Sequence, residues 1–135
     1  MAAFNKFNSF VEAVAEKVHN LGSDALMVAL SNTTPTSANA VLTDITEISY
    51  TNLSSRTITT TSSAQTSGTY KLVLADLVLT ASGAVATFRY IVLYNNTATN
   101  KELIGWYDYG AGVTLATGET FTIDFDGSAG VLTIA

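Results

Sequence analysis

Residues 85–109 constrain the fold of this chain more than any other stretch, because they read as two aromatic-rich strands joined by a polar loop. The stretch contains Trp106 and four of the six tyrosines, and the loop is rich in Asn and Thr. Aromatic and β-branched side chains favour a pleated surface that is at least half buried. We therefore expect these two strands to form the centre of the hydrophobic core.

Short strands separated by turn residues continue on both sides of this stretch, which predicts an all-β fold. Charged residues make up only 13% of the chain and apolar residues 47%, and the remainder is mostly Thr, Ser, Asn and Gly, a mixture typical of strands and turns. The expected strands are residues 25–30, 57–61, 70–80, 85–94, 102–109, 113–116, 119–126 and 131–134. Strands of this number and spacing favour a β-sandwich, and a jelly roll more than an immunoglobulin-like topology.

The connections between these strands carry their own predictions. Ser82 and Gly83 have the composition of a tight hairpin turn, so the strand at 70–80 should pair with the strand that follows it. The strand at 70–80 is apolar on both faces and should therefore be a central strand of its sheet. Pro35 excludes a central strand after residue 31. Residues 44–48 should form a helical turn within an ordered excursion.

The N-terminal residues predict one amphipathic helix, because apolar residues recur there at three- and four-residue spacing. Ser9 and Glu12 have the spacing of a capping box, so the regular helix should begin at Phe10, and Gly22 should end it. Two roles remain open. The apolar face covers the sheet, or the arm docks on a neighbouring subunit through three closely spaced phenylalanines, Phe4, Phe7 and Phe10.

The length of 135 residues predicts one β-sandwich domain, with residues 1–22 as an N-terminal arm and helix and residues 25–135 as a β-rich body. A net charge of −5 with only six basic residues argues against nucleic-acid binding. No apolar run approaches the roughly 20 residues that cross a bilayer, and no signal peptide is recognisable. We expect a product that is made in a cytoplasm and has no membrane partner.

No residue pattern predicts an enzyme, a cofactor or a metal site. His19 is the only histidine and has no triad partner at a recognisable spacing, so a structural or surface role is favoured. Asp124 and Asp126 lack the remainder of a calcium loop and fit the solvent face of an alternating strand. Asp44 and Glu47 resemble the paired carboxylates of glycosidases in type only, and capping of a turn is the simpler interpretation.

Three neighbouring aromatic residues, Trp106, Tyr107 and Tyr109, leave two interpretations open. Their rings can form a platform on which a sugar stacks, or they can pack in the core of an aromatic strand. The position of these residues in the central predicted strand favours core packing.

Two blocks of the sequence carry distinctive strings. Residues 10–56 include TDITEISYTNLSSR, and residues 77–126 include LIGWYDYG and FTIDFD. These blocks cover most of the chain and resemble a group of small structural proteins of tailed bacteriophages, similar to head decoration (cement) proteins with a jelly-roll fold. The resemblance implies a homotrimer on the outside of a capsid that clamps neighbouring subunits of the major capsid protein.

We therefore expect a non-enzymatic virion protein on the outer capsid surface, synthesised in the cytoplasm of a bacterial host. Its expected partners are the major capsid protein and further copies of itself. A receptor- or glycan-binding module that uses exposed Tyr or Trp is the first alternative. Another virion component, such as a tail or connector protein, is the second.

Overall fold

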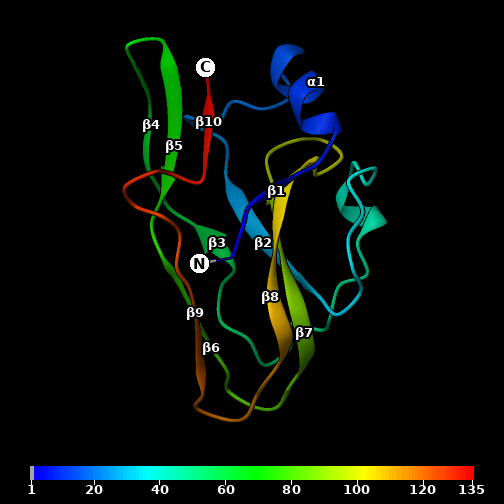
Figure 1. The fold of residues 1–135 in the computed structure, drawn as a ribbon. Helices are drawn as coiled ribbons and strands as arrows, with labels where there is room; N and C mark the ends of the chain where they lie inside the picture. The colour runs from blue at the N-terminus through cyan, green and yellow to red at the C-terminus, as the bar shows by residue number, and fades with distance from the viewer. Residues whose placement is uncertain (1) are drawn as a thin grey trace.

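Antiparallel strands dominate the computed structural model, which describes residues 2–135 (Figure 1), and the all-β prediction is confirmed. The helical elements of this part are the α-helix α1 (Ser9–Ala15) and the 3-10 turn η1 (Leu42–Asp44). The strands are β1 (Asn5–Lys6), β2 (Leu26–Ser31), β3 (Thr57–Ile58), β4 (Thr60–Thr66), β5 (Thr69–Leu74), β6 (Leu77–Thr80), β7 (Val85–Asn95), β8 (Leu103–Leu115), β9 (Thr120–Ile123) and β10 (Leu132–Ile134).

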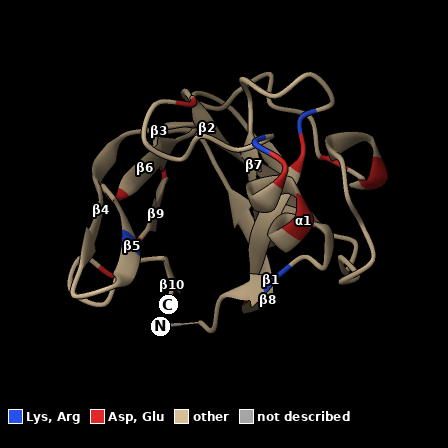
Figure 2. Cartoon of the chain, turned by 90° about the horizontal axis from the view of Figure 1, so that it is seen from above, with Lys and Arg blue, Asp and Glu red and all other residues tan. Residues whose placement is uncertain are grey.

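The strands form three antiparallel sheets. The largest has the order β1-β8-β7-β2-β3, and the smaller ones have the orders β10-β5-β4 and β6-β9. Figure 2 shows the largest sheet on one side of the molecule and the two smaller sheets on the other. The main core lies between these two layers, because its buried residues, among them Leu30, Leu72, Leu79, Phe88 and Leu93, come from all three sheets.

A second, smaller core covers the other face of the largest sheet. Phe7, Ile45, Val92, Tyr94 and Leu103 form it, and Trp106 packs against its edge. The largest sheet is therefore apolar on both faces, which explains why β7 is buried without interruption from Tyr90 to Asn95.

Polar side chains connect the long loop between β2 and β3 to the large sheet. The Tyr50 hydroxyl donates to Glu47 Oε1 at 2.7 Å and accepts from the Leu30 amide at 2.9 Å. The Arg56 guanidinium lies 3.6 Å from the centre of the Tyr50 ring and donates to the Val28 carbonyl at 2.7 Å. Tyr50 and Arg56 of the string TDITEISYTNLSSR therefore bind the backbone of β2.

Asp44 is also structural. Its Oδ2 atom accepts from the amides of Ala40 and Val41 at 2.8 and 3.1 Å, so it closes the 3-10 turn. The predicted turn over residues 44–48 therefore lies earlier in the chain, at Leu42–Asp44.

Several strand predictions are wrong. The strands expected at 102–109 and 113–116 form one strand, β8, and the strand expected at 57–61 is divided between β3 and β4, which belong to different sheets. The predicted hairpin at Ser82 and Gly83 does not form, because β6 pairs with β9, while β7 pairs with β2 and β8. The predicted strand at 70–80 is divided into β5 and β6, which belong to different sheets. Asp76 lies at the break and accepts a hydrogen bond from the amide of Phe125, which follows the end of β9, at 2.9 Å.

The helix is shorter than its periodicity predicts. It ends at Ala15, and Lys17 follows with a φ of 65°, a left-handed conformation that stops an α-helix. Leu21 and His19 are nevertheless buried, so the apolar periodicity continues through a turn instead of a helix. No helix in the described part of the chain has the length and apolar character needed to span a membrane.

Candidate functional site

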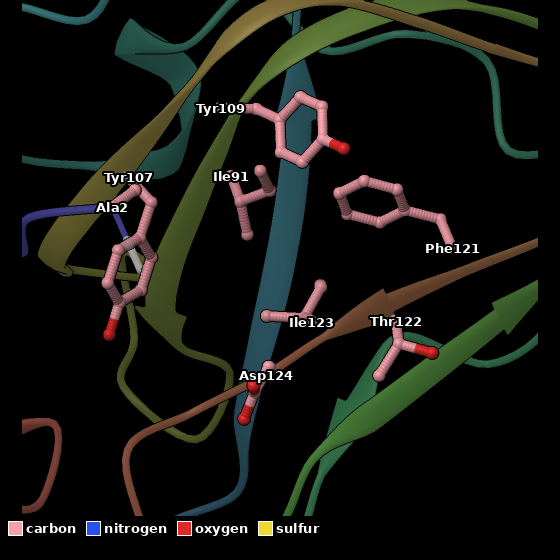
Figure 3. Close-up of a pocket in the computed structure, with 8 residues that line it drawn as sticks. All are labelled: Ala2, Ile91, Tyr107, Tyr109, Phe121, Thr122, Ile123 and Asp124. Atoms are coloured by element: carbon pink, nitrogen blue, oxygen red, sulfur yellow. The ribbon is translucent and has the colours of Figure 1, made fainter.

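A pocket of about 200 Å³ opens between β8 of the large sheet and β9 of the opposite layer (Figure 3). Its lining is mainly apolar and aromatic, with one carboxylate, and consists of Ala2, Ile91, Tyr107, Tyr109, Phe121, Thr122, Ile123 and Asp124. We call this set the aromatic pocket. Because the lining comes from three separate strands and the N-terminal arm, the pocket exists only in the folded chain.

A bulge in β8 builds one wall of the aromatic pocket. Asp108 pairs with Tyr90 and Val113 pairs with Phe88, so residues 109–112 of β8 face only Arg89 of β7. A bulge of this kind bends its strand and re-aims side chains. Here it carries Tyr109, whose side chain remains 55% exposed, to the rim of the pocket.

An ion pair holds the bulge. Arg89 Nε and Nη2 donate to the two carboxylate oxygens of Asp108 at 2.7 and 3.0 Å, and the Gly110 amide donates to the same carboxylate at 2.8 Å. The hydrogen bond from Arg89, followed by that from Gly110, holds the pKa of Asp108 below its ordinary value. Gly110 has a φ of 92°, which residues with side chains rarely adopt, so glycine suits this turn of the bulge.

Phe121 of β9 forms the opposite wall. Its ring makes edge-on contacts with Tyr109 at 5.1 Å and with Phe88 at 5.3 Å between ring centres. Such T-shaped pairs are favourable arrangements of aromatic rings. Phe121 therefore links the exposed rim at Tyr109 to the main core at Phe88.

Tyr107 forms the deeper part of the wall. Its ring lies 5.5 Å from Phe4 and 6.2 Å from Phe125 between ring centres. Burial, together with the nearby charge of Asp126, raises the pKa of Tyr107 to about 12, so the hydroxyl stays neutral at any physiological pH. The pocket consequently offers uncharged rings and a single negative group, Asp124.

Strand edges flank the pocket on both sides. β1 pairs with β8 only at Gly105 and Trp106, so among the described residues no strand pairs with this edge of β8 beyond Trp106. β9 pairs with β6 alone, which leaves its second edge without a partner strand in residues 2–135. The two layers are therefore not closed to one another by strand pairing at this side.

The aromatic platform foreseen from the sequence is divided between two faces of β8. The Trp106 ring packs against Phe7, tilted by 41° with 4.7 Å between ring centres, in the small outer core. Tyr107 and Tyr109 instead line the aromatic pocket. The prediction of core packing therefore describes Trp106 and Tyr107, whereas Tyr109 is available at the surface.

The three phenylalanines predicted as a possible interface pack within their own chain. Phe7 is fully buried and Phe10 is 4% exposed, so neither side chain is accessible to a partner in this conformation. Phe4 is half-buried against Tyr107. Of the two roles considered for the N-terminal residues, this placement is that of covering the sheet. The arm lies along β8, and the helix lies at one end of the main core.

His19 belongs to a separate, buried polar cluster. Asn95 Nδ2 donates to His19 Nδ1 at 3.0 Å and to Asp24 Oδ2 at 2.6 Å, while Asn95 Oδ1 accepts from the amides of Thr97 and Ala98 at 2.9 and 3.2 Å. All four hydrogen-bonding positions of the Asn95 amide are thus used.

This arrangement fixes the protonation of His19. Because Asn95 presents an N–H to Nδ1, that nitrogen acts as the acceptor and the proton of the neutral imidazole lies on Nε2, a buried atom with no hydrogen-bond partner in the described residues. Burial lowers the pKa of His19 from its ordinary value of 6.5, and the carboxylates of Glu102 and Asp24 oppose that shift. His19 therefore accepts a hydrogen bond from Asn95 as a neutral structural group.

The carboxylates considered for catalysis are not brought together. Asp44 accepts hydrogen bonds from backbone amides, whereas Glu47 accepts one from the Tyr50 hydroxyl. Asp126, which was considered as part of a calcium loop, accepts from the Ser128 and Ala129 amides in a turn. In the part of the chain that the structure describes, no three His, Cys, Asp or Glu side chains gather as metal ligands.

Sequence reasoning missed the contributions of Phe121, Ile123 and Asp124 to the pocket. The strict alternation of residues 119–126 assigns Phe121 and Ile123 to one face and Asp124 to the other, but it does not indicate which other strand packs against either face.

Comparison of the chain with protein-family models, with curated proteins and with solved structures finds no match.

Proposed function

We propose that this chain is a structural protein of a tailed-phage virion that binds the outside of the head and stabilises the lattice of the major capsid protein. The observation that supports this best is the aromatic pocket, which lies between β8 and β9 beside an outer edge of β9 that has no partner strand in the described residues. Exposed strand edges and apolar pockets are surfaces on which other protein chains dock. The resemblance in TDITEISYTNLSSR and FTIDFD supplies the specific biological setting.

The fold that accompanies this function is a jelly-roll-like β-sandwich with an N-terminal amphipathic helix. The chain supports this description by passing repeatedly between the layers. β2 and β3 belong to the large sheet, β4 to β6 to the opposite layer, β7 and β8 to the large sheet again, and β9 and β10 to the opposite layer. Crossing connections of this kind are typical of double-sheet jelly rolls.

The protein acts as a homotrimer, which binds the assembled lattice better than any disrupted state and so stabilises it by mass action. Three linked copies gain effective concentration, so each contact can be weak. The acidic net charge of −5 suits an outer position, away from packaged DNA.

The test compares phage particles with and without the protein. Particles that lack it should release DNA at lower temperature or after milder osmotic shock, and adding the purified protein should restore resistance. Co-sedimentation with particles measures binding, and the mass in solution should be about three times the 14.2 kDa of the chain. Equal DNA retention in both kinds of particle would remove the proposed mechanism.

Receptor or glycan binding is a second candidate, favoured by the 55% exposure of Tyr109 at the rim of a pocket. A glycan array should then show binding that the substitution Tyr109→Ala abolishes. A position in the tail or connector is a third candidate, which images of the particle separate from a position on the capsid surface.

A further inference from the structure

We propose that the aromatic pocket is an anchor site for one large apolar side chain, presented by an extended segment of a partner protein that also carries a Lys or Arg. The inference deepens the proposed function, on which it rests for the identity of the partner as the major capsid protein. The site itself follows from the size, edges and charge of the pocket.

Size limits the occupant to a single side chain. The pocket holds about 200 Å³. A buried apolar cavity of about 150 Å³ is large enough for benzene, whereas sites for whole small molecules usually measure about 300–1,000 Å³. Phe121, Ile91 and Ile123 line the volume with rings and branched chains, so a phenyl or a branched aliphatic group is the best match.

The strand edges predict an extended backbone for the partner. The edge of β8 beyond Trp106 is next to residues 2–4 of the arm, with Phe4 against Tyr107 and Ala2 in the pocket lining. The outer edge of β9 has no partner strand among residues 2–135. A strand that adds to such an edge gains main-chain hydrogen bonds and places alternate side chains into neighbouring pockets. β1 already binds part of the β8 edge in this way, with Asn5 opposite Trp106.

Charge predicts a cation beside the anchor. Asp124 is the one charged residue that lines the described pocket, and no Lys or Arg lines it. Lys71, whose charge acts on Asp126, donates a hydrogen bond to the Ser128 carbonyl at 2.8 Å. A basic residue on the partner complements the exposed carboxylate of Asp124.

The lining favours a peptide over a sugar. Sugar hydroxyls need several converging polar groups, but the polar side-chain atoms of this lining belong only to Thr122, Asp124 and the two tyrosines. The ring of Tyr109 also makes an edge-on contact with Phe121, which leaves less of the aromatic surface for a sugar face.

The test uses the full chain, labelled with ¹⁵N, and the capped peptide Ac-Thr-Phe-Thr-Lys-Thr-NH₂. The peptide should shift the amide signals of Tyr109, Thr122 and Asp124. Replacing its Phe by Ala should weaken binding by about tenfold or more, because the buried apolar group is lost. Replacing its Lys by Glu should weaken binding by about two- to fivefold, the range of an exposed ion pair.

A pair of matched variants locates the site. Thr122→Arg places a cation in the exposed part of the pocket lining beside Asp124, and should weaken peptide binding at least about two- to fivefold, the loss expected when the ion pair with Asp124 is removed. Thr120→Arg makes the same change on the same face of β9, at an exposed residue that does not line the pocket, and should bind like the wild type. Equal binding by both variants, no shift at the pocket, or a shift produced only by methyl β-galactoside overturns the proposal.

Binding to particles separates this inference from the proposed function. Thr122→Arg should bind phage particles more weakly than Thr120→Arg does. If Thr122→Arg binds particles as well as the wild type, the pocket is not the anchor and the capsid function stands. If the wild type binds the peptide but no particles, the proposed capsid function is refuted, whereas the proposed peptide site is supported.

Discussion

Acid should destabilise this protein through His19, and the substitution His19→Gln should remove that part of the acid sensitivity. The side chain is 7% exposed, packs 5.5 Å from the Phe10 ring and accepts a hydrogen bond from Asn95. Protonation of Nδ1 would set an N–H against an N–H. Rotation of the Asn95 amide offers no relief, because its oxygen already accepts from Thr97 and Ala98.

The sign follows from the lowered pKa of His19. The unfolded chain takes up the proton at its ordinary pKa of 6.5, before the folded chain does, so the free energy of unfolding falls as the pH falls below 6.5. Glu102 and Asp24 face His19 and attract its cation, which limits the loss. At pH 5.5 the loss has an upper bound of about 1.4 kcal/mol, one pH unit of differential protonation.

Urea unfolding at pH 7.5, 6.5, 5.5 and 5.0, followed by far-UV circular dichroism, measures the effect. With a slope of about 2 kcal/mol per M, the midpoint of the wild type should fall by up to about 0.7 M more than that of His19→Gln by pH 5.5. Asp108 and Asp126, whose pKa values are lowered in the fold, also lose stability in acid, but equally in both proteins. A difference between the two proteins that is constant over this range would refute the assignment of a neutral His19.

Further outcomes follow from the same structure. Phe7→Ala should lower the free energy of unfolding by about 3–5 kcal/mol in urea titrations, because a fully buried ring packed against Trp106 is lost. Gly105→Ala should cost about 1–3 kcal/mol and expose the arm to proteolysis, since the added methyl would lie 2.7 Å from the Asn5 carbonyl oxygen and against the Phe4 ring. Absorbance at 295 nm should show two late tyrosine ionisations, because burial raises the pKa of Tyr107 to about 12 and raises the pKa of Tyr50 further, and Tyr107→Phe should remove the earlier of the two steps.

Local pattern was sufficient for the centre of the fold. β7 and β8 pair with one another across a short loop, and both hold the aromatic and β-branched residues that predicted them. β8 is longer than predicted, because the strands expected at 102–109 and 113–116 are continuous, and Gly110 and Gly112 between them lie in a bulge of β8.

Long-range pairing was not predictable from the same signals. β6 leads directly to the Ser82-Gly83 turn, which resembles a hairpin, yet its partner is β9, more than 35 residues away. The residue composition of a strand does not indicate which other strand it will pair with. The aromatic pocket was missed for the same reason, since Tyr109 and Phe121 meet across two layers.

The buried cluster around His19 was likewise hidden. His19 was assigned a structural or surface role, and it is buried, but its partner Asn95 looked like a loop residue in an Asn-rich segment. Only the fold brings the end of β7 to the turn that follows α1.

The bulge in β8 has a consequence for how sequences of this kind can diverge. Three surplus residues lie between the Asp108–Tyr90 and Val113–Phe88 pairs, so the segment can lengthen or shorten by a residue while the ladder on either side keeps its alignment. The rim of the pocket can thus be remodelled by small insertions and deletions without cost to the interior. The molecule thus keeps the segment whose length can vary apart from the buried residues whose alignment is fixed.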